Sequence, residues 1–256
     1  MPRPRAARVE PTPVARAGVA LPGNGVSYVA VYVILMGPQG SGKGTQAAVI
    51  GPELKLVKIA TGELFRSAIA AKSELGQTVE GILARGELVP DAVTNAIVRE
   101  RLAAVVAQAR SGDGTVNGAL FDGFPRNVAQ AKALDEIFAE LGETLTAVIE
   151  IDVPRPALIE RLAGRRTGAT TGTIYNVNGL SDEEIAAFGE DLIQRDDDRP
   201  EAIAVRLGIY DEQTAPVLAY YAERGLVSTV NGDQDVEAVT AAIREAIAAR
   251  LAAKAS

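Results

Sequence analysis

The chain has 256 residues, of which 47% are hydrophobic and 23% charged, a composition typical of a globular protein with a sizeable core. Its formal net charge of −7 argues against a general nucleic-acid binder, because such proteins usually carry a basic surface. Cysteine and histidine are both absent, which excludes disulfides, thiolate zinc sites and every mechanism that uses a catalytic cysteine or histidine.

Residues 1–27 differ in composition from the rest of the chain. They contain four arginines, five prolines and a single acidic residue, without helical or strand periodicity. This composition is typical of a disordered tail, and the segment lacks the continuous apolar core of a secretory signal. We interpret this segment as a disordered tail, or as an artefact of a start site assigned too early, with the true start of the protein near Val31. No apolar run of the chain approaches the roughly 18 residues of a membrane span.

From residue 28 onward, short apolar runs alternate with helical patterns. This alternation predicts an α/β fold, a doubly wound parallel sheet of about five strands flanked by helices. The expected strands are residues 28–36, 56–59, 119–121, 147–153 and 226–230. The expected helices are one from about residue 42, then 62–71, 75–85, 92–109, 128–141, 156–164, 203–224 and 236–253. Residues 165–199 interrupt the alternation and are interpreted as a mobile lid.

The clearest motif is GPQGSGKGT at residues 37–45, which directly follows the first predicted strand and opens a helix. Glycines let successive backbone N–H groups point at phosphate oxygens, and the helix N-terminus adds its dipole. A simple turn would need one or two glycines, not four with a lysine in this register. We therefore expect a phosphate-binding loop for ATP, with contacts from Gly40, Ser41, Gly42, Lys43, Gly44 and Thr45.

The residue after the lysine departs from the general phosphate-loop pattern. That pattern has a Ser or Thr there, whose hydroxyl binds Mg²⁺. Here Gly44 takes the position and Thr45 follows it, so Mg²⁺ should depend more on substrate phosphates, water and a carboxylate elsewhere. The loop resembles the G-x-P-G-x-G-K-G-T form of adenylate kinases, with Gln39 where that form usually has proline.

Three further segments strengthen the resemblance to the adenylate kinase family. TGELFR at 61–66 resembles its TGD/E-x-x-R element, and GELVPD at 86–91 resembles its G-x-L-V segment. FDGFPR at 121–126, followed by Gln130, matches its signature. The four segments occur in the family's order between about residues 28 and 250. The resemblance implies reversible phosphoryl transfer from ATP to AMP, giving two ADP.

The resemblance also assigns residues to the acceptor site. Arginine suits it because a guanidinium forks onto phosphate oxygens, and Gln130 carries both a donor and an acceptor for the adenine edge. Thr61 is alternatively a helix cap. Asp122, at the end of a predicted strand, can orient the waters of Mg²⁺ beside the loop. The expected AMP contacts are Thr61, Arg66, Val89, Gly123, Arg126, Gln130, Arg195 and Arg206.

Arginines gather around the predicted lid. The resemblance maps Arg161 and Arg165 onto donor-phosphate arginines. Residues 195–198 resemble the R-x-D-D element of the family, and Arg206 corresponds to its next arginine. Phosphoryl transfer mainly requires alignment and neutralisation of charge. The AMP phosphate is already largely ionised near pH 7, with a second pKa of about 6, so no general base is needed. The expected catalytic residues are Lys43, Arg126, Arg161, Arg165, Arg195 and Arg206.

The lid resembles the long form found in the family, which many relatives stabilise with four cysteines around zinc. Gly168 and Thr171 occupy the positions of the first cysteine pair, so no zinc site is expected. Tyr175 is expected to line the ATP base. The hypothesis for lid stability is a small apolar cluster of Ile174, Leu180, Ile185 and Phe188.

The resemblance divides the chain into a core (28–60, 91–164 and 200–256), an AMP-binding segment (61–90) and the lid (165–199). It implies ATP and AMP as partners, Mg²⁺ as cofactor, and a cytoplasmic monomer that binds neither nucleic acid nor membrane. Three alternatives stay open: a kinase for CMP, UMP or GMP or with GTP as donor, an ATPase or nucleotide-dependent binding module, and a catalytically dead scaffold. The second explains the phosphate loop but neither the acceptor segments nor the arginines.

Overall fold

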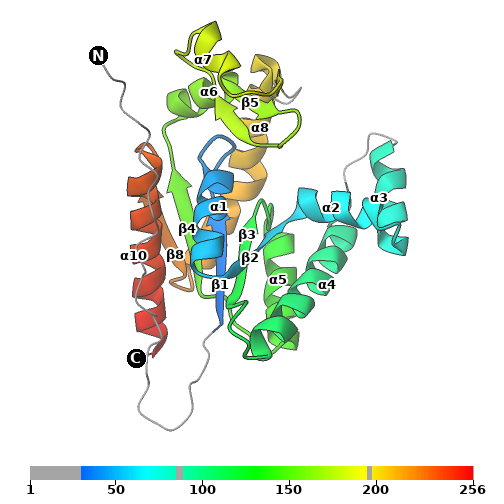
Figure 1. The fold of residues 1–256 in the computed structure, drawn as a ribbon. Helices are drawn as coiled ribbons and strands as arrows, with labels where there is room; N and C mark the ends of the chain where they lie inside the picture. The colour runs from blue at the N-terminus through cyan, green and yellow to red at the C-terminus, as the bar shows by residue number, and fades with distance from the viewer. Residues whose placement is uncertain (1–29, 85–88, 195–197, 256) are drawn as a thin grey trace.

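A central parallel sheet organises the protein (Figure 1). The structure, a computed structural model, describes residues 30–84, 89–194 and 198–255. The strand order is β2–β3–β1–β4–β8, so all five strands expected from the sequence are present within a few residues of their predicted bounds. They are β1 (Val31–Met36), β2 (Leu56–Ala60), β3 (Gly118–Asp122), β4 (Ala147–Asp152) and β8 (Val227–Asn231). The expected tail, residues 1–27, lies outside the described residues.

Helices cover both faces of this sheet, as expected for a parallel sheet with two apolar faces. Along β1, Ile34 packs into one hydrophobic cluster and Leu35 into the other, because neighbouring strand residues point to opposite faces. The first cluster is completed mainly by α4 (Asp91–Arg110), α5 (Val128–Glu140) and α9 (Ala215–Ala222). The second is completed mainly by α1 (Lys43–Glu53), α6 (Arg155–Ala163), α8 (Pro200–Ile209) and α10 (Val236–Ala255).

The carboxyl ends of the strands bring the sequence motifs to one edge. Leu35 of β1 and Ala60 of β2 both pair with Asp122 of β3, so the phosphate loop, the start of α2 and Asp122 are neighbours. The helices α2 (Thr61–Ala70) and α3 (Glu74–Ala84) project sideways from this edge (Figure 1). In open parallel sheets ligands bind at this edge.

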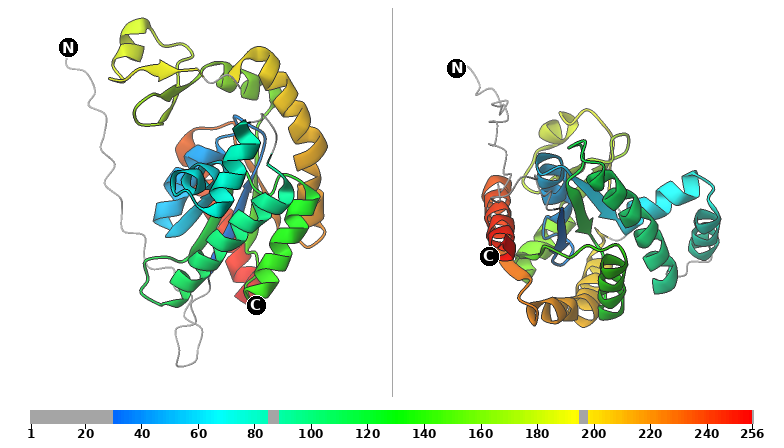
Figure 2. Two further views of the ribbon diagram at one scale, coloured as in Figure 1. Left: turned by 90° about the vertical axis from the view of Figure 1, so that its right-hand side faces the viewer. Right: turned by 90° about the horizontal axis from the view of Figure 1, so that it is seen from below.

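Above the same edge lies a second, smaller sheet within residues 165–193 (Figure 2, left). It is antiparallel, with the order β6–β5–β7, and the short helix α7 (Asp182–Ala186) follows β6. Its strands are β5 (Arg165–Gly168), β6 (Ile174–Asn176) and β7 (Leu192–Ile193). Strands this short and this exposed leave no alternating pattern in the sequence, which is why the segment was expected only as an irregular excursion.

The single helix expected over residues 203–224 is interrupted. A π-helix, Tyr210–Thr214, separates α8 from α9, and Pro216 lies in the first turn of α9. Proline has no N–H, so it cannot donate the i→i−4 hydrogen bond of a continuous helix. Within the π-helix, the Thr214 hydroxyl donates to the carbonyl oxygen of Arg126 at 2.9 Å. No helix in the described part of the chain is long and apolar enough to cross a membrane.

The start of β3 depends on the absence of a side chain at Gly118. Its φ is +142°, and a Cβ there would lie 1.9 Å from the carbonyl oxygen of Val31. We expect Gly118→Ala to lower the free energy of unfolding by more than about 3 kcal/mol, measured by urea denaturation. Gly112→Ala is the matched control, because Gly112 also has positive φ but faces open space. It should cost only about 1–2 kcal/mol; equal losses for both variants would contradict the steric argument.

Candidate active site

The phosphate loop leaves β1 through a sharp turn at Gly37. This residue has φ +141°, and a Cβ there would lie 2.7 Å from the Ile151 carbonyl oxygen on the neighbouring strand. Glycine is therefore required at the point where the loop begins. The loop then enters α1 at Lys43, so that the helix N-terminus faces the carboxyl edge of the sheet.

Lys43 is folded back onto its own loop. Its Nζ donates to the carbonyl oxygens of Gly37 at 2.7 Å and Pro38 at 2.8 Å. Burial lowers the pKa of Lys43 to about 8, which the Asp122 carboxylate opposes. The guanidinium groups of Arg126, Arg165 and Arg206 lower this pKa further, because they place like charges near the ammonium. Three guanidinium groups from separate segments thus act on the ammonium of Lys43, and the Asp122 carboxylate opposes them.

Asp122 stands between the phosphate loop and β2. Its Oδ2 lies 3.6 Å from Lys58 Nζ, and a Cβ built on Gly44 would lie 3.8 Å from the same oxygen. The glycine that replaces the usual hydroxyl residue after the lysine therefore faces this carboxylate. In the described residues no group of three or more acidic side chains is suited to enclose a metal ion.

Arg126 is fixed by one hydrogen bond from its side chain and one from its backbone. Its Nε donates to the Gly123 carbonyl oxygen at 2.8 Å, and its own N–H donates to Gln130 Oε1 at 2.8 Å. Burial lowers the pKa of Arg126, the charge of Arg206 lowers it further, and Asp122 opposes both. The structure thus brings Arg126 and Arg206 together, as two residues expected at the acceptor phosphate.

Gln130 is buried and part of a network that the sequence did not reveal. Its Nε2 donates to Asp91 Oδ1 at 2.6 Å, and Asn127 Nδ2 donates to the other oxygen of Asp91 at 3.0 Å. Asn127 also caps α5 by accepting from the Gln130 N–H at 2.8 Å. In the sequence, Asp91 and Asn127 look only like polar residues of the kind that commonly stand at the start of a helix. Adenine recognition by Gln130 stays a prediction, and it would use the second amide hydrogen and the remaining lone pairs of the oxygen.

The other expected acceptor residues lie along α2 and beside it. Thr61 is buried as the first residue of α2, and the N-cap is Ala60, so the capping interpretation of Thr61 is wrong. Arg66 is exposed and folds back over the first turn, with one terminal nitrogen 3.5 Å from a Cβ built on Gly62. Val89 is half-buried, whereas residues 85–88 lie outside the described part of the chain. AMP contact by Thr61, Arg66 and Val89 stays a prediction.

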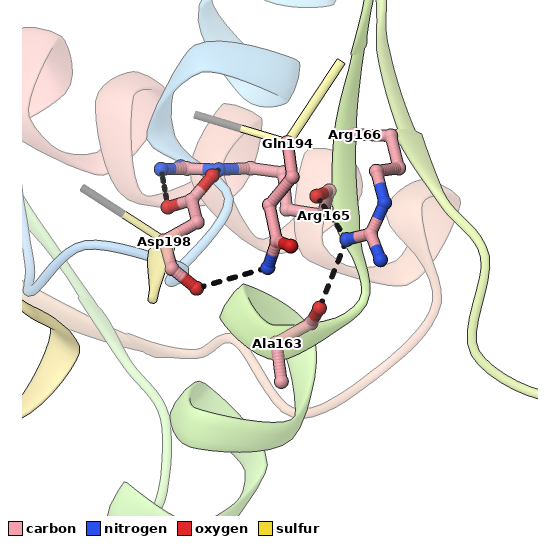
Figure 3. A network of polar contacts seen from close by, with 5 residues as sticks. All are labelled: Ala163, Arg165, Arg166, Gln194 and Asp198. Atoms are coloured by element: carbon pink, nitrogen blue, oxygen red, sulfur yellow. Dashed lines mark hydrogen bonds and ion pairs between the residues drawn. The ribbon is translucent and has the colours of Figure 1, made fainter. Parts of the chain in front are cut away.

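Arg165 is fixed by a buried carboxylate (Figure 3). Its Nε donates to Asp198 Oδ2 at 2.8 Å, and a terminal nitrogen bonds the other oxygen in a short bidentate pair. Gln194 Nε2 donates to the backbone oxygen of Asp198 at 3.2 Å (Figure 3). Asp198 has no exposed surface, and although it ends the segment that resembles the R-x-D-D element, its pairing with Arg165 was not predicted. A bidentate pair orients a guanidinium before any phosphate arrives.

Arg161 is attached to the loop that follows β8. It donates to the Gly232 carbonyl oxygen at 3.0 Å and to Asp233 Oδ1 at 3.1 Å. Arg161 is therefore oriented by a different element from Arg165. Arg195, expected to be catalytic, lies outside the described residues together with positions 196 and 197.

A polar network around Glu190 organises the lid. Its carboxylate accepts from the backbone N–H groups of Thr170 at 3.2 Å and Thr171 at 3.1 Å, from the Thr171 hydroxyl at 2.7 Å, and from the Tyr175 hydroxyl at 2.9 Å. The Tyr175 and Phe188 rings stack, with centroids 4.5 Å apart. Of the expected apolar cluster, Ile174 is 48% exposed, whereas Leu180, Ile185 and Phe188 are half-buried. The cluster therefore stays a prediction without Ile174. Contact of Tyr175 with the ATP base stays a prediction.

Comparison with known proteins gives a consistent family match. The family model for adenylate kinase matches residues 35–226. An adenylate kinase of Symbiobacterium thermophilum is 45% identical over 222 residues, covering 86% of this chain and 99% of the relative. Adenylate kinases of Moorella thermoacetica and Oceanobacillus iheyensis are 47% and 44% identical, covering 84% and 81% of this chain and 97% and 94% of the relatives.

The lowered pKa of Lys43 predicts a pH-dependent stability. The group binds its proton with a pKa of about 8 in the folded state and near the ordinary value of 10.5 in the unfolded state. Between these values the unfolded state holds more protons, so this group makes stability rise with pH. In urea unfolding at pH 7 to 10, wild type should gain stability relative to Lys43→Met above about pH 8. A difference in stability between wild type and Lys43→Met that stays constant with pH would contradict the lowered pKa. Lys132→Met, at an exposed position of α5, controls for the loss of a lysine.

The Glu190 network predicts a local loss of order in the lid. Glu190→Ala removes the acceptor of four hydrogen bonds, so backbone amides within residues 168–176 should exchange with deuterium roughly tenfold faster. Amides of the central sheet should be unchanged. Glu184→Ala is the control, because Glu184 accepts only within the capping box of α7. Equal exchange in both variants would show that Glu190 does not hold the lid together.

Proposed function

Because this chain belongs to the adenylate kinase family, we propose that it catalyses the reversible transfer of a phosphoryl group from ATP to AMP, giving two ADP. The observation that carries the proposal is the convergence of Arg126, Arg165 and Arg206 on Lys43 at the carboxyl edge of the sheet. The three guanidinium groups lower the pKa of Lys43, whereas Asp122 opposes them and Asp198 pairs with Arg165. A chain of phosphate groups supplies the negative charge that would neutralise them.

Catalysis by these residues is mainly positional and electrostatic. The N–H groups of the phosphate loop and Lys43 bind the donor phosphates, and Lys43 must exchange its bonds to Gly37 and Pro38 for phosphate oxygens. Arg126, held by Gly123 and Gln130, binds the acceptor phosphate on the side of the site opposite the donor phosphates. Arg165 and Arg206 neutralise charge on the group in transfer. No residue removes a proton, since the acceptor phosphate is already ionised.

The residues at the carboxyl edge of the sheet fit a Mg²⁺ ion that enters together with ATP. This ion keeps several waters and uses one or two protein carboxylates, not an enclosing cage, and Asp122 stands directly beside the start of α1. Asp122 would hold the ion through water. When bound, Mg²⁺ supplies positive charge to the donor phosphate oxygens. The rest of the charge comes from the side chains described above.

We propose that the acceptor segment (61–90) and the lid (165–199) close over the core from two sides. The small sheet lies above the phosphate loop, and α2 and α3 project from the edge beside it (Figure 2). Closure of both would exclude water from the phosphates and so suppress hydrolysis of ATP. The resemblance to the family also implies a monomer in the cytoplasm whose partners are ATP and AMP.

An acceptor assay tests the function directly. The purified protein is incubated with Mg·ATP and with AMP, CMP, UMP or GMP in turn, and ADP is measured. We expect rapid ADP formation with AMP, no comparable rate with the others, and a loss of at least about a hundredfold in Lys43→Ala, because a positioned cation on the transferring group is removed.

The controls separate the competing functions. Lys132→Ala, a loss of an exposed lysine on α5, should keep the wild-type rate. ADP forming equally fast without any monophosphate would identify a hydrolase and refute the acceptor site. Preference for CMP, UMP or GMP would keep the reaction but change the acceptor.

A further inference from the structure

We propose that Lys58 lowers the affinity of the donor site for its divalent cation by partly neutralising Asp122, and that Glu63 limits this effect by competing for the same ammonium. The inference rests on the proposed function, because the cation enters with ATP. It concerns residues outside the phosphate loop and outside the arginine set.

The register of the sheet places Lys58 beside Asp122. Ala60 of β2 pairs with Asp122 of β3, and Lys58 lies two residues earlier on β2. Residues two apart on a strand share a face, so both charged side chains project from the face that α1 covers. Lys58 Nζ is 3.6 Å from Asp122 Oδ2. A Cβ on Gly44, in the first turn of α1, would lie 3.8 Å from the same oxygen.

Lys58 is shared between two carboxylates. Its Nζ donates to Glu63 Oε1 at 2.7 Å, nearer than Asp122. The side chain of Asp122 is 17% exposed and that of Glu63 is 51% exposed. Charge interactions at the less exposed carboxylate are weakened less by solvent. Lys58 therefore bonds most directly to Glu63, while its charge acts on the carboxylate that faces the phosphate loop.

A fixed ammonium beside Asp122 opposes a second cation on the same carboxylate. Mg²⁺ with its waters would meet a positive charge already 3.6 Å from Oδ2. Removing Lys58 leaves Asp122 with its full negative charge toward the nucleotide. Removing the Glu63 charge has the opposite effect, because the ammonium then has Asp122 as its nearest carboxylate partner. Glu63 belongs to the first turn of α2, so this ion pair also connects the acceptor segment to the metal side of the donor site.

The test measures binding of Mn²⁺, a paramagnetic probe for the divalent site, to the complex of the protein with the non-hydrolysable β,γ-imido analogue of ATP. Free Mn²⁺ is followed by electron paramagnetic resonance, with protein in excess so that all nucleotide is bound. Lys58→Gln should lower the Kd for Mn²⁺ about three- to fivefold, the effect of one charge of a partly exposed pair. Lys58→Arg should keep the wild-type Kd, and Glu63→Gln should raise it.

Each outcome decides for or against the inference. Lys132→Gln on α5 makes the same charge change on the opposite face of the sheet, and should leave the Kd unchanged. An unchanged or higher Kd for Mn²⁺ in Lys58→Gln would show that Lys58 only pairs with Glu63 on the surface, whether or not the melting temperature falls. This result would overturn the inference and leave the proposed function standing. Wild-type protein that adds nothing to the affinity of the free analogue for Mn²⁺ would overturn both the inference and the role of Asp122.

Discussion

The structure depends on one electrostatic constraint, the burial of the Lys43 ammonium inside a loop of its own backbone. Two carbonyl oxygens satisfy this ammonium, but three guanidinium groups act on it and one carboxylate opposes them. A site with this excess of positive charge is costly to fold and favourable to fill with phosphate. The parallel sheet makes this site possible, because strand ends from distant parts of the chain meet at one edge.

The cations are held in place by partners that are not phosphate. The guanidinium of Arg126 is held through Gly123, that of Arg161 through Gly232 and Asp233, and that of Arg165 through Asp198. Most of these bonds use only part of the guanidinium, which has five donors. Each arginine can therefore keep an anchoring bond while it turns the rest of its donors to a nucleotide. Such pre-orientation reduces the entropy lost on binding.

The core of the fold was predictable because its strands are continuous apolar runs and its phosphate loop carries glycines at positions of forced geometry. The positions of Asp122 and Arg126 followed from the motif that begins in the last two residues of β3. The partner of Asp198 and the role of Glu190 were not identified, because their partners are 33 and up to 20 residues away in the sequence. The lid strands are too short to leave a periodic pattern. The π-helix arises from one proline in an otherwise helical stretch, and Thr61 begins its helix without capping it.

We expect the phosphate groups of the two bound nucleotides to lie between Lys43 on the donor side and Arg126 and Arg206 on the acceptor side. A crystal structure of the protein with the β,γ-imido analogue of ATP and with AMP measures this directly. We expect Lys43 Nζ to be released from the carbonyl oxygens of Gly37 and Pro38 and to lie within about 3 Å of a donor phosphate oxygen. Arg126 and Arg206 should contact phosphate oxygens of the facing nucleotide. Lys43 still bonded to its loop, or AMP bound away from Arg126, would contradict it.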